Sequence, residues 1–216
     1  MSHYFRFPIQ CCLAYPGRPI AVISNGYGEI GFNRLIYSRF KSVLEKMHIN
    51  WVHYVYYART LPWPNGKLLI SEGLESLESI VKWLSHKKFK NIGLFGISFG
   101  ANISLDLASR VLECPQIEYL ILVNTPINYY EFRIKQLGEQ NLKEWEKLGF
   151  IDVVYSDGEV RVPYQFITES IEQKLDIRMK EVSSPVLAFQ AESDALIDCA
   201  SSRKTFEQIE KSHFLP

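Results

Sequence analysis

Apolar residues follow two alternating patterns along this chain. Short continuous apolar runs indicate buried strands, and the predicted strands are residues 19–24, 51–57, 91–97, 119–123 and 186–190. Between them, apolar residues recur every three or four positions, and the predicted helices are residues 30–47, 74–84 and 99–112. Such an alternation is typical of a mostly parallel central sheet with helices on both faces. The sequence therefore predicts an α/β fold, with residues 4–7 and 9–14 forming an edge hairpin or strand pair.

Residues 126–182 interrupt this alternation. They contain a helical pattern at 131–147 with Gly149 as its stop, followed by two β-rich runs around the turn dipeptide Asp157-Gly158. We expect a helical-plus-hairpin cap, inserted over the carboxyl edge of the sheet. The rest of the chain has no linker, so residues 1–216 are expected to form a single domain.

Composition narrows the possible partners and the compartment. With 216 residues and 47% hydrophobic content, one sizeable core can form. The 24 basic and 24 acidic side chains cancel, so no overall field favours nucleic acid. The amino terminus lacks a secretory signal pattern, and no apolar run approaches the ~20 residues of a membrane span. These features indicate a cytoplasmic protein without a membrane span.

Four cysteines, at positions 11, 12, 114 and 199, show no CxxC spacing. In a cytoplasmic protein this favours buried free thiols over disulfides. No histidine and carboxylate spacing suggests a metal site, and no glycine-rich phosphate loop is present. We therefore expect neither a metal nor a cofactor.

Residues 96–100 read Gly-Ile-Ser-Phe-Gly and match the G-x-S-x-G elbow of serine hydrolases. This short pattern is only moderately specific by itself. Here an apolar strand leads into it and a helix leads out, which is the context that a nucleophile elbow requires. Ser98 is therefore predicted to be a nucleophile, and the alternative is a serine that simply caps the following helix.

A nucleophilic serine needs donors for the oxyanion that forms when a carbonyl is attacked. The amide of Phe99 is one candidate, because it lies at a helix amino terminus. The second is expected in the loop 25–28, which reads Asn-Gly-Tyr-Gly after an earlier strand, and the Tyr27 amide is the candidate. In the alternative interpretation these glycines only form a strand-to-helix turn.

The strand and glycine loop, the elbow, the insertion and the late acidic loop together resemble the α/β-hydrolase family, in particular its esterase, acyl thioesterase and serine-aminopeptidase-like branch. The resemblance covers most of the chain. In this family the catalytic acid follows a late strand, which implies Asp194 in the segment 191–197. Asp198, or a purely structural role for Asp194 as a loop cap, is the alternative.

The histidine departs from the family pattern. In the family it follows the acid, and only His213 does so here, 19 residues later, where the last strand should begin rather than end. Either His213 is recruited directly, or the chain is shortened at its C-terminus and stops before the histidine of its relatives; we favour the second. A missing last strand would leave an open sheet edge and favour a homodimer. The remaining histidines, expected to be surface or core residues, are His3, His48, His53 and His86.

Two functions from different classes follow. The first is a serine hydrolase that acts on a carboxylic ester or acyl thioester, a small-molecule acyl substrate, through an acyl-enzyme on Ser98. The second is a catalytically impaired binding or interaction protein on the same fold, which the missing histidine favours. An aminopeptidase would need acidic groups beside the pocket, such as Glu72 or Glu192. The insertion either covers an acyl chain with its aromatic residues or uses them as its own core.

Overall fold

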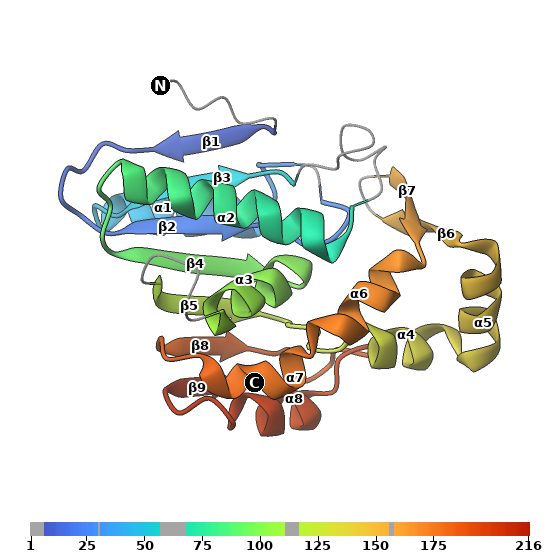
Figure 1. Cartoon of the computed structure of the whole chain (residues 1–216). Coiled ribbons are helices and arrows are strands. Elements are labelled where there is room, and N and C mark those ends of the chain that lie inside the picture. Colours follow the sequence, from blue (N-terminus) through green and yellow to red (C-terminus); the bar gives the residue numbers. More distant parts are fainter. Residues whose placement is uncertain (1–6, 30, 57–67, 111–116, 156–157) are drawn as a thin grey trace.

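A computed structural model describes residues 7–29, 31–56, 68–110, 117–155 and 158–216 (Figure 1). Seven strands form one sheet in the order β1-β3-β2-β4-β5-β8-β9, and all neighbours are parallel except β1, which runs antiparallel to β3. The strands are β1 (Ile9–Cys12), β2 (Ile20–Ser24), β3 (Asn50–Tyr54), β4 (Ile92–Ile97), β5 (Ile117–Val123), β8 (Val186–Phe189) and β9 (Ser212–Leu215). This confirms the predicted α/β fold with a mostly parallel sheet.

Helices cover both faces of the sheet because successive residues of each strand point to opposite sides. On β2, Ile20 and Val22 join the core beneath helices α2 and α3, whereas Ala21 and Ile23 join a smaller cluster beneath helix α1. The helices that flank the sheet are α1 (Leu35–Lys46), α2 (Ile70–His86), α3 (Phe99–Ser109) and α8 (Cys199–Phe206).

The parallel register brings several strand ends to the same edge. Ser24 at the end of β2 lies level with Tyr54 of β3 and Gly96 of β4. The loops that follow β2 and β4 therefore begin side by side, and these are the loops in which the sequence predicts the oxyanion donor and the nucleophile.

In the segment between β5 and β8, residues 129–155 and 158–163 lie beyond the carboxyl ends of the strands, and residues 165–181 lead back alongside α3 (Figure 1). The segment consists of α4 (Tyr129–Leu137), α5 (Glu139–Leu148), the hairpin of β6 (Phe150–Tyr155) and β7 (Gly158–Pro163), α6 (Gln165–Gln173), α7 (Leu175–Arg178) and a 3₁₀ turn (Met179–Glu181). The prediction of a single helix at 131–147 is wrong, because Gly138 adopts φ 80° and separates α4 from α5. Gly149, at φ 77°, ends α5 as predicted.

Buried polar contacts join this segment to α3. The side-chain amide of Gln173 donates to Asn102 Oδ1 at 3.0 Å. Arg178 forms an ion pair of 2.7 Å with Asp106, whose side chain is fully buried, and donates to Ser109 Oγ at 2.7 Å. Helices α6 and α7 are thus anchored to the helix that follows the elbow.

The described cysteines are free thiols, but their predicted burial is wrong for Cys11, which is exposed, while Cys12 and Cys199 are half-buried. The reason for Cys11 is its position on the edge strand β1, where only β3 is a neighbour. Cys114 lies outside the described residues. None of the helices in the described part of the chain is long and apolar enough to cross a membrane.

Candidate active site

Ser98 occupies a sharp bend between β4 and α3. Its backbone adopts φ 51° and ψ −112°, a conformation that non-glycine residues rarely take. The bend is fixed on both sides, since Ser98 N–H donates to Val123 O at 2.8 Å and Ser98 O accepts from the amide of Ala101 at 3.0 Å. The Ser98 hydroxyl forms no capping hydrogen bond to α3. The alternative of a serine that caps the helix through its side chain is therefore contradicted.

Both glycines of the G-x-S-x-G motif are required by close backbone contacts. A Cβ on Gly96 would lie 2.4 Å from the carbonyl of Gly100, and a Cβ on Gly100 would lie 2.3 Å from Ser24 O. These distances are far below van der Waals contact. Gly96 therefore allows the start of α3 to pack against β4, and Gly100 allows it to pack against the end of β2.

The two predicted oxyanion donors lie on neighbouring segments. A Cβ on Gly100 would also contact Asn25 O at 2.7 Å, so the start of α3 packs against the loop that carries Tyr27. The amide of Phe99 is the first in α3 and has no carbonyl acceptor within the helix. The rings of Tyr27 and Phe99 meet edge to face, with centroids 5.3 Å apart.

A cluster of buried aromatic rings surrounds Phe99. Phe166 of α6 lies 5.1 Å from Tyr27 and 4.8 Å from Tyr129 of α4, measured between ring centroids. These two aromatics of the insertion thus join the main core beside the elbow. Trp145 is buried in the same cluster and donates to Val162 O. These three aromatic residues are therefore core residues, and a contact of the insertion with an acyl chain stays a prediction.

Asp194 lies in the loop after β8 and is half-buried. Its Oδ1 accepts hydrogen bonds from the amides of Leu196 and Ile197, at 2.9 and 3.0 Å, and Gln190 donates to Oδ2 at 3.3 Å. One carboxylate oxygen thus shapes the loop. The alternative acid, Asp198, is exposed and caps α8 by accepting from Ser201 N–H at 2.7 Å, a bond that lowers the pKa of Asp198.

His213 is the second residue of β9, opposite Leu187 of β8, and its side chain is exposed. Two strands, β5 and β8, separate β9 from β4, which corresponds to a lateral offset of roughly 14 Å. Within the described ranges, no hydrogen bond joins Ser98, Asp194 and His213. The structure therefore brings the elbow and the candidate oxyanion loop together but leaves the histidine apart.

The other described histidines have different surroundings. His48 and His86 are exposed, as expected for surface residues, and His3 lies outside the described residues. His53 is fully buried in β3, where its Nε2 is hydrogen-bonded to Asn25 Oδ1. The sequence predicts His53 to be a surface or core residue but does not predict this contact with the candidate oxyanion loop, because the sequence does not show which residues face each other across β2 and β3.

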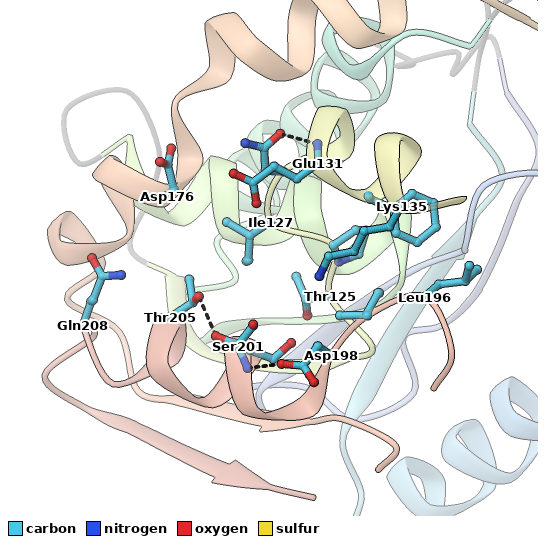
Figure 2. A pocket seen from close by; sticks show the side chains of 15 residues that line it. Thr125, Ile127, Glu131, Lys135, Asp176, Leu196, Asp198, Ser201, Thr205 and Gln208 are labelled. Atoms are coloured by element: carbon cyan, nitrogen blue, oxygen red, sulfur yellow. Dashed lines mark hydrogen bonds between the residues drawn. The ribbon is translucent and has the colours of Figure 1, made fainter. Parts of the chain in front are cut away.

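A cavity of about 160 Å³ opens at the carboxyl ends of β5 and β8. Figure 2 shows Thr125 and Ile127 from the segment after β5, Lys135 from α4 and Ser201 from α8 around it. Leu196 and Ile197 of the Asp194 loop also line this cavity. The described residues contain no group of three or more histidine, cysteine or acidic side chains that could hold a metal ion.

Comparisons with solved structures agree with this architecture. Alpha/beta hydrolase domain-containing protein 10 from mouse superposes with a TM-score of 0.73 at 16% identity, covering 96% of this chain and 82% of that chain. Est1E from Butyrivibrio proteoclasticus gives 0.72 at 15% identity, covering 92% and 77%. The monoacylglycerol lipase of Paleococcus ferrophilus gives 0.73 at 13% identity, covering 98% and 88%. At these identities the likeness shows the fold alone.

The family of this chain follows from its sequence. No curated protein sequence matches this chain. The family described as BAAT / Acyl-CoA thioester hydrolase C terminal matches residues 74–213, which include the elbow, the insertion and the Asp194 loop. Because this match covers more than half of the sequence and the fold is that of α/β hydrolases, the chain belongs to the BAAT / acyl-CoA thioester hydrolase C-terminal family.

Proposed function

We propose that this protein is a serine hydrolase that cleaves a carboxylic ester or an acyl thioester through an acyl-enzyme on Ser98. The observation that carries the proposal is the backbone of Ser98, which takes φ 51° between strand and helix while its hydroxyl does not cap α3. A strained residue with an uncommitted hydroxyl, at the carboxyl edge of a parallel sheet, is typical of a nucleophile.

In the proposed reaction, Ser98 Oγ attacks the substrate carbonyl carbon and its proton passes to a general base. The amides of Tyr27 and Phe99 stabilise the oxyanion of the tetrahedral intermediate. When the intermediate collapses, the carbon–oxygen or carbon–sulfur bond breaks and the leaving group takes the proton. Water then attacks the acyl-enzyme in the same way and releases the carboxylic acid and free Ser98.

Asp194 is proposed to orient the base through Oδ2, which accepts one hydrogen bond from Gln190, because Oδ1 already accepts from two loop amides. For the base itself, the candidates are His213, which lies within β9, and a residue other than His213.

The family match favours an acyl thioester, such as an acyl-CoA, as the substrate. We propose that residues 126–182 act as a cap over the carboxyl edge of the sheet. Tyr129 and Phe166 lie beside Phe99, which supports an apolar environment for the acyl chain close to Ser98.

A fluorophosphonate probe combined with an acyl-CoA hydrolysis assay tests this proposal. The probe should label the wild type and fail to label Ser98→Ala, and the same variant should lose turnover by about 10³-fold or more. A variant His213→Ala separates the two candidate bases. Loss of labelling in it assigns the base to His213, and retained labelling assigns the base to another residue. An unlabelled wild type would exclude a working nucleophile.

The second candidate function is a binding or interaction protein that retains the fold without catalysis. It is favoured by the exposed position of His213, which has no hydrogen bond to Ser98 or Asp194. Saturable binding of a non-hydrolysable acyl-CoA analogue by a wild type without acyl-CoA or short-chain ester turnover would support it. Turnover that disappears in Ser98→Ala belongs only to the hydrolase.

A further inference from the structure

The loop that carries Tyr27 contains a turn that is fixed by the half-buried side chain of Glu29. Gly26 O accepts from the amide of Glu29 at 3.3 Å, which closes the turn. Gly26 N–H lies 2.9 Å from Glu29 Oε2 and 3.2 Å from the hydroxyl of Tyr37, which itself donates to the Glu29 carboxylate. Arg34 holds the other carboxylate oxygen, Oε1, at 3.0 Å. Both polar groups of Gly26 are thus engaged by Glu29.

This arrangement determines where the Tyr27 amide points. In a trans peptide the carbonyl of one residue and the N–H of the next lie in one plane and point in opposite directions. Because Gly26 O is directed at the amide of Glu29, the N–H of Tyr27 is directed away from the turn. The orientation of the candidate oxyanion donor therefore depends on the turn between Gly26 and Glu29.

A second set of contacts fixes the start of the same loop. Asn25 accepts from Nε2 of His53 through its side-chain oxygen, and its side-chain nitrogen donates to Glu29 O at 3.2 Å and Gly31 O at 3.3 Å. The hydroxyl of Tyr56 donates to Asn25 O at 2.7 Å. Three groups of Asn25 and two of Gly26 are consequently tied to β3, to Tyr56 just after it, to α1 or to the turn.

We propose that Glu29 and Tyr37, together with His53 acting through Asn25, are positioning residues for the Tyr27 amide. The proposal rests on the proposed function, since it presumes an oxyanion beside Ser98. None of these side chains needs to touch substrate. Their effect is to hold a backbone donor in place before the reaction, which is what makes such a donor effective.

The test compares Glu29→Ala with Glu29→Gln, which keeps an oxygen for the Gly26 amide. The matched control is Ser184→Ala, which removes one buried hydrogen bond, to Ile117 O, at the amino edge of the sheet. Each variant is assayed for kcat and KM on acyl-CoA, and its amide hydrogen exchange is measured in peptides covering residues 25–29.

For Glu29→Ala we expect kcat to fall about 10- to 100-fold with KM within about twofold, because the donor acts on the transition state. Exchange at 25–29 should become faster in the same variant. Glu29→Gln should recover most of the lost kcat, and Ser184→Ala should retain wild-type kcat and wild-type exchange at 25–29.

The outcomes separate this inference from the proposed function. A wild type without turnover overturns the proposed function, and the inference with it. An active wild type whose Glu29→Ala variant retains its kcat overturns the inference alone. Reduced kcat with unchanged exchange at 25–29 would also overturn it, because the loop would then be positioned without Glu29.

Discussion

At the scale of single residues, His53 shows how a histidine can lie near a candidate active site without serving as its base. It is fully buried, and Nε2 is bonded to Asn25, while Nδ1 has no hydrogen-bond partner among the described residues. Burial, with a smaller contribution from the charge of Lys41, lowers the pKa of His53 to about 3. A neutral imidazole with a pKa so far below 7 is a poor proton acceptor, so His53 has a structural role.

The lowered pKa makes the stability of the protein depend on pH. In the unfolded chain the pKa of His53 is about 6.5, so protons bind preferentially to the unfolded state as the pH falls below that value. As the pH falls from ~6.5 to about 3, this group should therefore lower the free energy of unfolding by roughly 1.4 kcal/mol per pH unit. Above pH ~6.5 His53 is neutral in both states and makes no such contribution.

Urea denaturation at several pH values between 7 and 4 measures this slope. The variant His53→Gln keeps a side-chain donor for Asn25 but cannot titrate. We expect its free energy of unfolding to be lower than that of the wild type at pH 7 and to change less steeply with acid. Equal slopes in the two proteins would show that His53 is not the responsible group.

At the scale of elements, the bend at Ser98 joins β4 to α3 through backbone contacts that leave no space for a side chain. Gly100 packs on the last carbonyl of β2, so the position of α3 relative to β2 is determined by two backbones in contact. The backbone atoms of a central strand cannot move aside. A methyl group added at Gly100 would therefore displace α3.

Gly100→Ala should consequently destabilise the protein by about 2 kcal/mol or more and abolish fluorophosphonate labelling of Ser98. The control is Gly31→Ala, since a Cβ on Gly31 would meet nothing within 4 Å. Thermal unfolding monitored by circular dichroism checks the stability of both variants. Wild-type stability of Gly100→Ala would contradict the close packing of α3 on β2.

The sequence predicts features that depend on local pattern better than those that depend on tertiary contacts. The central strands and the bend at Ser98 were predictable because buried strands are continuous apolar runs and because G-x-S-x-G favours a tight bend. The expectation of a missing last strand is wrong, since β9 (Ser212–Leu215) pairs with β8. The break at Gly138 was missed, since helical periodicity continues across it and a single glycine is tolerated in many helices. The contacts of Glu29 with Tyr37 and of His53 with Asn25 leave no periodic signal in the sequence.

At the scale of the whole molecule, the insertion is held to the central fold by charged groups as well as by the aromatic cluster. Asp106 of α3 is fully buried and forms ion pairs with Arg178 at 2.7 Å and Arg110 at 3.0 Å. Arg178 also donates to the carbonyls of Gln173 and Asp106, each at 3.2 Å. The carboxyl ends of α6 and α7 are therefore fixed against the helix that begins after Ser98.

Removal of the Asp106 carboxylate should loosen this junction. In Asp106→Ala, two guanidinium groups lose their counter-charge while remaining largely enclosed, and we expect a loss of about 2 to 4 kcal/mol in the free energy of unfolding. Hydrogen exchange should accelerate in residues 165–181 more than in β2 or β4. The control, Asp152→Ala, removes an exposed pair with Arg161 on the hairpin and should leave the melting temperature unchanged.

If exchange in Asp106→Ala rose equally in the sheet and in residues 165–181, Asp106 would stabilise the whole domain instead of anchoring the insertion. Faster exchange confined to 165–181, together with reduced acyl-CoA turnover, would show that the insertion must be held in place for the site beside Ser98 to work.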